Sequence, residues 1–149
     1  MADMTDSGVR SELEVNAYLA DLRYALGSDA QLTFQSERMV DRNREQKYTN
    51  KYTVAALFPN EDPREALRRE LASLNASNYL RTVQDRRFPK RSAMWEFGKV
   101  YNDEDEVYIK IRVELLTREG LGNHATFVMS FHFAQRPFSE EVFPYRRGC

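Results

Sequence analysis

The sequence predicts an α+β fold, in which helices come first and a small antiparallel sheet comes last. Apolar side chains recur at helical spacing in the first half of the chain, whereas the second half holds three segments rich in β-branched and aromatic residues. The last two of these segments alternate with a period of two, the pattern of strands that bury one face. We therefore expect helices packed on a C-terminal three-strand meander.

The first helix is predicted from about Ser11 to Gly27. Ser11 is a favourable N-cap, and the acidic residues of the first turn suit the positive end of the helix dipole. Residues 1–10 are predicted to form a flexible tail, because this end of the chain begins with small and polar residues. The buried stripe of the helix is expected to comprise Val15, Tyr18, Leu19, Leu22 and Leu26.

The middle of the chain has weaker patterns. Residues 31–34 are predicted as a short strand, and residues 36–47, with mixed charges, as a solvated loop or the end of a short helix. Residues 51–57 fit a strand and a helix equally well. A helix is predicted from Asp62 to about Ser73, since an N-cap followed by proline starts helices well. Residues 75–82 suit a short turn or helix.

A basic loop is predicted to lead into the sheet, because proline interrupts a crowded set of charges. Its cations are Arg81, Arg86, Arg87, Lys90 and Arg91, which Asp85 opposes. The three strands are expected over residues 94–101, 106–113 and 126–133. Residues 102–105 have the composition of a hairpin turn, and residues 117–123 that of a longer turn. The tail after Phe133 contains proline and aromatic residues and is expected to pack irregularly against the sheet.

The alternation predicts which side chains share a face of the sheet. One face is expected to bury Val107, Ile109, Ile111 and Val113 together with Phe127, Met129, Phe131 and Phe133. The opposite face then carries Tyr108, Lys110, Arg112, Ser130 and His132. This face combines cations with one phenol and one imidazole, so we take it as the candidate working surface.

Composition limits the possible functions. The 149 residues predict a single domain with a sizeable core. A net charge of −1 does not by itself indicate nucleic-acid binding, and the single cysteine, Cys149, excludes a disulfide framework. No apolar run is long enough to span a membrane and no signal peptide follows Met1, so a soluble cytoplasmic protein is expected.

Known catalytic motifs are absent from the sequence. With only His124 and His132 as histidines and no HExxH motif, no metal site is expected. Neither a Walker loop nor a GxGxxG or GxSxG motif is present, so no nucleotide cofactor or α/β-hydrolase chemistry is indicated. We expect no cofactor.

Metal-free cleavage of RNA remains as a candidate chemistry, in which the 2′-hydroxyl attacks the adjacent phosphate. His132 is the natural acid or base, and Tyr108 is a possible base if nearby cations lower its pKa. Lys99, Lys110 and Arg112 would hold the phosphate, and the basic loop would track the backbone. Trp95 or Phe97 would stack a base.

Each of these residues also has a purely structural interpretation. His132 lies between two phenylalanines and is as well explained by a half-buried position with a satisfied hydrogen bond. Lys99, Lys110 and Arg112 are equally consistent with an ordinary solvated face of the sheet. Trp95 and Phe97 are equally consistent with positions in the core. The basic loop would also suit an acidic protein partner.

Four blocks of the sequence resemble the MqsR-like (motility quorum-sensing regulator) toxins of bacterial type II toxin–antitoxin systems. The blocks are Trp95-Glu96-Phe97-Gly98-Lys99, Glu106-Val107-Tyr108-Ile109-Lys110-Ile111, Ser130-Phe131-His132-Phe133-Ala134 and Phe143-Pro144-Tyr145. Their order and spacing are similar to those of the family, and residues 51–79 resemble the helical region before its sheet. The toxin-like core would span residues 51–146, and the helix over 11–27 would be an addition to it.

The resemblance implies a RelE-like fold and a ribosome-independent mRNA interferase that cuts single-stranded mRNA without a metal. It assigns roles to Tyr108 and His132, and it puts Glu96 where the best-known member has glutamine. Arg81 is the nearest substitute for the family's phosphate-contacting lysine. A cognate antitoxin and single-stranded mRNA would be the partners. The alternatives are a non-catalytic interaction or nucleic-acid-binding protein that uses the same face, and a protein that blocks translation at the ribosome.

Overall fold

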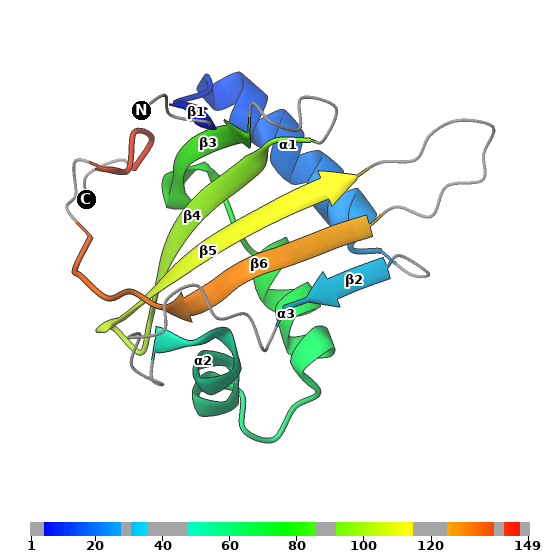
Figure 1. The fold of residues 1–149 in the computed structure, drawn as a ribbon, viewed down its shortest axis with the longest axis vertical. Helices are drawn as coiled ribbons and strands as arrows, with labels where there is room; N and C mark the ends of the chain where they lie inside the picture. The colour runs from blue at the N-terminus through cyan, green and yellow to red at the C-terminus, as the bar shows by residue number, and fades with distance from the viewer. Residues whose placement is uncertain are drawn as a thin grey trace.

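The computed structural model describes residues 5–27, 31–35, 48–85, 92–114, 125–138 and 142–146. Within them the chain is α+β, as expected, with two helices behind one face of a mixed sheet and a third beside the end of its last strand (Figure 1). The elements are β1 (Thr5–Gly8), α1 (Glu12–Ala25), β2 (Gln31–Phe34), α2 (Asn50–Leu57), α3 (Pro63–Ala72), a 3₁₀ turn (Ala76–Asn78), β3 (Tyr79–Asp85), β4 (Met94–Tyr101), β5 (Asp105–Glu114) and β6 (Ala125–Phe133).

In the part of the chain that the structure describes, the sheet has six strands in the order β1-β3-β4-β5-β6-β2. The predicted meander of β4, β5 and β6 is confirmed, and Asn102 and Asp103 at its first turn have φ of 54° and 65°. Three further strands extend it, of which β1 and β3 pair antiparallel and β2 runs parallel to β6. In Figure 1, α1 and α3 lie behind the sheet and α2 lies near the end of β6.

Helix α1 forms as predicted. The Ser11 side chain accepts a hydrogen bond from the Glu14 backbone N–H, and the Glu14 carboxylate accepts one from the Ser11 N–H. The buried side chains of its stripe reach the sheet, and Tyr18 stacks on Trp95 with ring centroids 3.9 Å apart. The prediction of a flexible tail is wrong for Thr5–Gly8, because these residues pair with β3 as an edge strand.

The ambiguous segment after residue 50 is helix α2, and two buried polar residues attach it to β6. Asn50 donates to the carbonyls of Gln35 and Met129, at 2.8 and 3.0 Å, and accepts from the Phe131 N–H at 3.0 Å. Thr53 Oγ1 accepts from the Phe133 N–H at 2.9 Å. Because β2 ends at Phe34, α2 supplies the hydrogen bonds that a neighbouring strand would otherwise make with β6.

The predicted set of core residues on β6 needs one correction. The pairing with β5 shifts between Lys110 and Ile111, so that Ile109 faces Phe131 whereas Ile111 faces Val128. Met129 is the extra residue of a β-bulge. Because of it, the side chains before Met129 point to the opposite face from the one that a regular alternation predicts. Val128 is fully buried beside the helices, whereas Phe127 lies opposite Arg112 on the other face. Phe127 and Met129 therefore do not share the face of Phe131 and Phe133.

The basic segment is also different from its prediction. Arg81 belongs to β3, which begins at Tyr79, and is not part of a loop. Arg86, Arg87, Lys90 and Arg91 lie outside the described residues, as do the predicted loops over residues 36–47 and 117–123.

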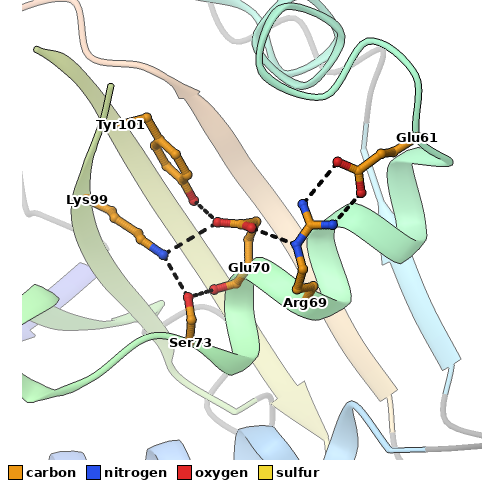
Figure 2. A network of polar contacts seen from close by, with 6 residues as sticks. All are labelled: Glu61, Arg69, Glu70, Ser73, Lys99 and Tyr101. Carbon is orange, nitrogen blue, oxygen red and sulfur yellow. Dashed lines mark hydrogen bonds and ion pairs between the residues drawn. The ribbon is translucent and has the colours of Figure 1, made fainter. Parts of the chain in front are cut away.

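A polar network joins α3 to the end of β4 on the helix side of the sheet (Figure 2). Glu70 accepts hydrogen bonds from Tyr101 Oη at 2.8 Å and Arg69 Nε at 2.9 Å, and Lys99 Nζ lies 3.4 Å away. Lys99 also donates to Ser73 Oγ at 2.7 Å, and Arg69 pairs with Glu61. Although burial alone raises the pKa of Glu70, the bonds from Arg69 and Tyr101 and the nearby cations bring it below its usual value.

The pKa of Glu70 predicts a loss of stability in acid. A carboxylate with a lowered pKa stabilises the fold above its unfolded pKa of about 4.3, and this stabilisation disappears as the pH falls through the folded value. We expect Glu70→Gln to cost about 1–3 kcal/mol at pH 7 and to flatten the acid limb of stability against pH. Urea unfolding from pH 7 to pH 3 tests this, with exposed Glu65→Gln as the control. A parallel decline in wild type and variant would contradict it.

Candidate functional site

The candidate site lies on the second face of the sheet, which we define as the face turned away from α1 and α3. The strand register places Tyr108 directly opposite both Gly98 and His132, and Lys110 opposite both Glu96 and Ser130. Arg81 pairs with Glu96 from the other side. Side chains of these residues therefore form two adjacent rows across β3 to β6.

Tyr108 and His132 form the centre of this face. Their ring centroids are 5.4 Å apart and the ring planes are inclined by 42°. Tyr108 is half-buried, and only 7% of the His132 surface is exposed. The sequence prediction that the phenol and the imidazole share a face is confirmed by this register.

A backbone hydrogen bond defines the state of the His132 ring. Its Nδ1 lies 3.0 Å from the carbonyl oxygen of Phe133. Because a carbonyl oxygen only accepts, Nδ1 carries the proton in this bond, and Nε2 holds the lone pair whenever the ring is neutral. Nε2 is thus the atom that is able to accept a proton.

An ion pair whose carboxylate is buried lies beside the two rings. Glu96 is 3% exposed, and its Oε1 accepts a hydrogen bond from Arg81 Nε at 3.0 Å. This bond raises the pKa of Arg81, and the phenol of Tyr108 is close enough to add to the shift. A buried carboxylate is costly unless it is paired. The geometry therefore holds the Arg81 guanidinium through Nε, while about half of this side chain remains exposed to solvent.

Two further cations belong to the same face. Lys110 stands between Glu96 and Ser130 in the register. The Arg112 guanidinium lies 4.6 Å from the centroid of the Phe127 ring, and its Nε is 3.5 Å from Glu114. The second face thus combines three cations with a phenol, an imidazole and a carboxylate, which together are able to bind an anion and transfer protons beside it.

Three of the predicted residues lie elsewhere. Lys99 is on the helix side, bound to Glu70 and Ser73, so it does not reach the phenol–imidazole pair. Trp95 packs on Tyr18 of α1, and Phe97 is fully buried. The structural interpretation of both aromatic residues is therefore correct, and neither is placed to stack a base.

The C-terminal segment packs against the sheet, as expected, and it borders the site. Phe138 and Phe143 pack edge to face, with centroids 5.5 Å apart, over Gly98 in the row of Tyr108. The Phe138 N–H donates to the Glu106 carboxylate at 3.1 Å. A glycine in the middle of a strand often marks a place where another part of the chain packs closely against the backbone. Gly98 was therefore the signal in the sequence that could have predicted this contact.

Adding a methyl group at Gly98 should disturb this contact. A Cβ there would lie 2.9 Å from one ring atom of Phe143 and 3.0 Å from one of Phe138. We expect Gly98→Ala to lower the free energy of unfolding by about 1–3 kcal/mol. Gly8→Ala is the matched control, because a Cβ at Gly8 has no atom within 4 Å. Equal melting temperatures for the two variants would contradict the predicted clash.

Two features are absent from the described residues. No helix among them is long and apolar enough to cross a membrane. Within the same ranges, no group of three or more histidine, cysteine or acidic residues is placed to hold a metal ion. Comparison of the chain with protein-family models, with curated proteins and with solved structures finds no match.

Proposed function

We propose that the protein is a metal-independent endoribonuclease, the mRNA interferase toxin of a bacterial toxin–antitoxin system. The observation that carries the proposal is the opposition of Tyr108 and His132 beside the Arg81–Glu96 pair. The motif resemblance to MqsR-like toxins supports it, and so do helices packed on one face of a largely antiparallel sheet, the arrangement that a RelE-like fold requires.

The reaction needs a base, an acid and positive charge at the phosphate. A base takes the proton of the 2′-hydroxyl, the 2′-oxygen attacks phosphorus, and the 5′-oxygen leaves with a proton from the acid. His132 Nε2 and the Tyr108 hydroxyl exchange these protons. Arg81, Lys110 and Arg112 stabilise the charge that builds on the phosphate oxygens. The products are a 2′,3′-cyclic phosphate and a 5′-hydroxyl.

A cognate antitoxin would silence this activity by covering the second face or by pairing with an edge of the sheet. Both edge strands, β1 and β2, have four residues. Addition of a strand at such an edge is a common mode of protein recognition.

Expression of the wild type and of His132→Ala side by side tests the proposal. We expect the wild type to arrest bacterial growth and to cleave naked RNA in EDTA, and the variant to do neither. Cleavage of naked RNA also separates this activity from a block of translation at the ribosome. If the wild-type protein neither arrests growth nor cuts RNA, the nuclease proposal fails.

A second candidate function is a non-catalytic protein that binds RNA or another partner through the same face. The burial of His132 and its bond to the Phe133 carbonyl favour this candidate. It predicts a gel shift with single-stranded RNA, no cleavage products and normal binding by His132→Ala.

A further inference from the structure

A pocket of about 280 Å³ lies where the start of α2 meets the start of β5 and the end of β6. We call it the Tyr52 pocket. Its lining residues are Tyr48, Tyr52, Glu104, Asp105, Glu106, Phe133, Ala134 and Pro137. None of these residues belongs to the proposed nuclease site.

The walls of the Tyr52 pocket are held in place by hydrogen bonds. Thr53 and Asn50 attach α2 to β6 through the N–H groups of Phe133 and Phe131. On the opposite wall, the Ala134 N–H donates to the Glu106 carbonyl at 2.8 Å. A ligand would therefore enter a pocket that is already formed, which lowers the cost of binding.

The lining combines aromatic rings with negative charge. Tyr52 and Phe133 have ring centroids 6.3 Å apart and planes inclined by 65°, and Tyr48 adds a third ring to the lining. Three consecutive acidic residues, Glu104 to Glu106, complete it. Aromatic rings attract cations through their quadrupole, and carboxylates add a direct charge attraction.

We propose that the Tyr52 pocket binds an organic cation, namely the arginine or lysine side chain of another polypeptide. The volume suits one long side chain, since pockets for drug-sized ligands begin at about 300 Å³. A divalent metal needs several converging oxygen ligands, and in the described residues no cluster of three or more histidine, cysteine or acidic residues is placed to provide them. The rings instead provide contact area for the hydrocarbon stem of an arginine or lysine.

Titration of the ¹⁵N-labelled full chain with Nα-acetyl-arginine amide tests this proposal by nuclear magnetic resonance. We expect saturable shifts of the amide signals of residues 104–106 and 133–134. The neutral isostere Nα-acetyl-citrulline amide should bind at least about fivefold more weakly, which corresponds to about 1 kcal/mol. Equal shifts with both compounds, or saturation by Mg²⁺ alone, would overturn the proposal.

Three variants show which groups carry the binding. Tyr52 is 43% exposed, so Tyr52→Leu should fold normally and weaken the arginine compound about threefold or more, as loss of a cation–π contact predicts. Tyr52→Phe keeps the ring and should bind like the wild type. Tyr24→Leu removes an exposed tyrosine from α1 and is the matched control. If Tyr52→Leu and Tyr24→Leu bind alike, the aromatic part of the proposal is wrong, whatever the outcome of the nuclease assays.

Discussion

Replacing His132 with alanine is expected to lower kcat for RNA cleavage by about 10²–10⁴-fold, the usual contribution of a positioned acid or base. The expectation rests on the position of the imidazole, whose ring centroid is 5.4 Å from that of Tyr108 and whose Nδ1 is held by the Phe133 carbonyl. Single-turnover cleavage of a short single-stranded RNA in EDTA measures the effect. RNA binding should change little, because the phosphate is held by the cations.

Two controls separate chemistry from folding. Since His132 is buried, its removal also perturbs packing, so His132→Gln should be assayed with it and both melting temperatures recorded. Tyr108→Phe should slow cleavage as well, whereas Tyr52→Phe, on α2, should not. A Tyr108→Phe enzyme with unchanged kcat would remove the phenol from the mechanism.

Replacing Asn50 with alanine is expected to be the most damaging change outside the site, at about 3 kcal/mol of unfolding free energy. Asn50 is 3% exposed and makes three hydrogen bonds to the backbone of β6 and of Gln35. Alanine would leave the buried Phe131 N–H without its acceptor. The loss of each such partner costs about 1–3 kcal/mol.

Urea unfolding of Asn50→Ala measures this loss, with Asn16→Ala, an exposed asparagine on α1, as the control. Hydrogen exchange of the Phe131 amide should accelerate in the Asn50 variant only. A loss below about 1 kcal/mol would show that water or a neighbour replaces the amide group.

The sequence correctly predicted the helices and strands whose formation depends on residues close together in the chain. The capping box at Ser11, the Asp62-Pro63 start of α3 and the alternation over Val107 to Val113 all depend on residues a few positions apart. Strand β1 was missed because Thr5-Asp6-Ser7-Gly8 has little strand propensity, and only pairing with β3 makes it a strand. The same long-range dependence explains why Arg81 was assigned to a loop.

Only part of the candidate site was predicted, because the rest depends on how the strands pair. Tyr108 and His132 lie on the same face because the bulge at Met129 comes before His132 in β6 and leaves their register intact. The bulge itself has no clear sequence signal, so Phe127 was placed on the wrong face. Lys99 was grouped with Tyr108 by its charge, although Gly98 is the residue that faces Tyr108. The Arg81–Glu96 pair depends on the register of β3 with β4, which the sequence alone does not contain.

The ends of the RNA fragments are the most direct test of the central claim, that a phenol, an imidazole and cations on one side of the sheet drive attack by the 2′-hydroxyl. Purified protein should be incubated with a labelled RNA in EDTA, next to the same oligonucleotide carrying 2′-O-methyl groups. The account predicts fragments with 2′,3′-cyclic phosphate and 5′-hydroxyl ends from the RNA, and none from the methylated strand. Cleavage of the methylated strand, or 5′-phosphate ends, would contradict it.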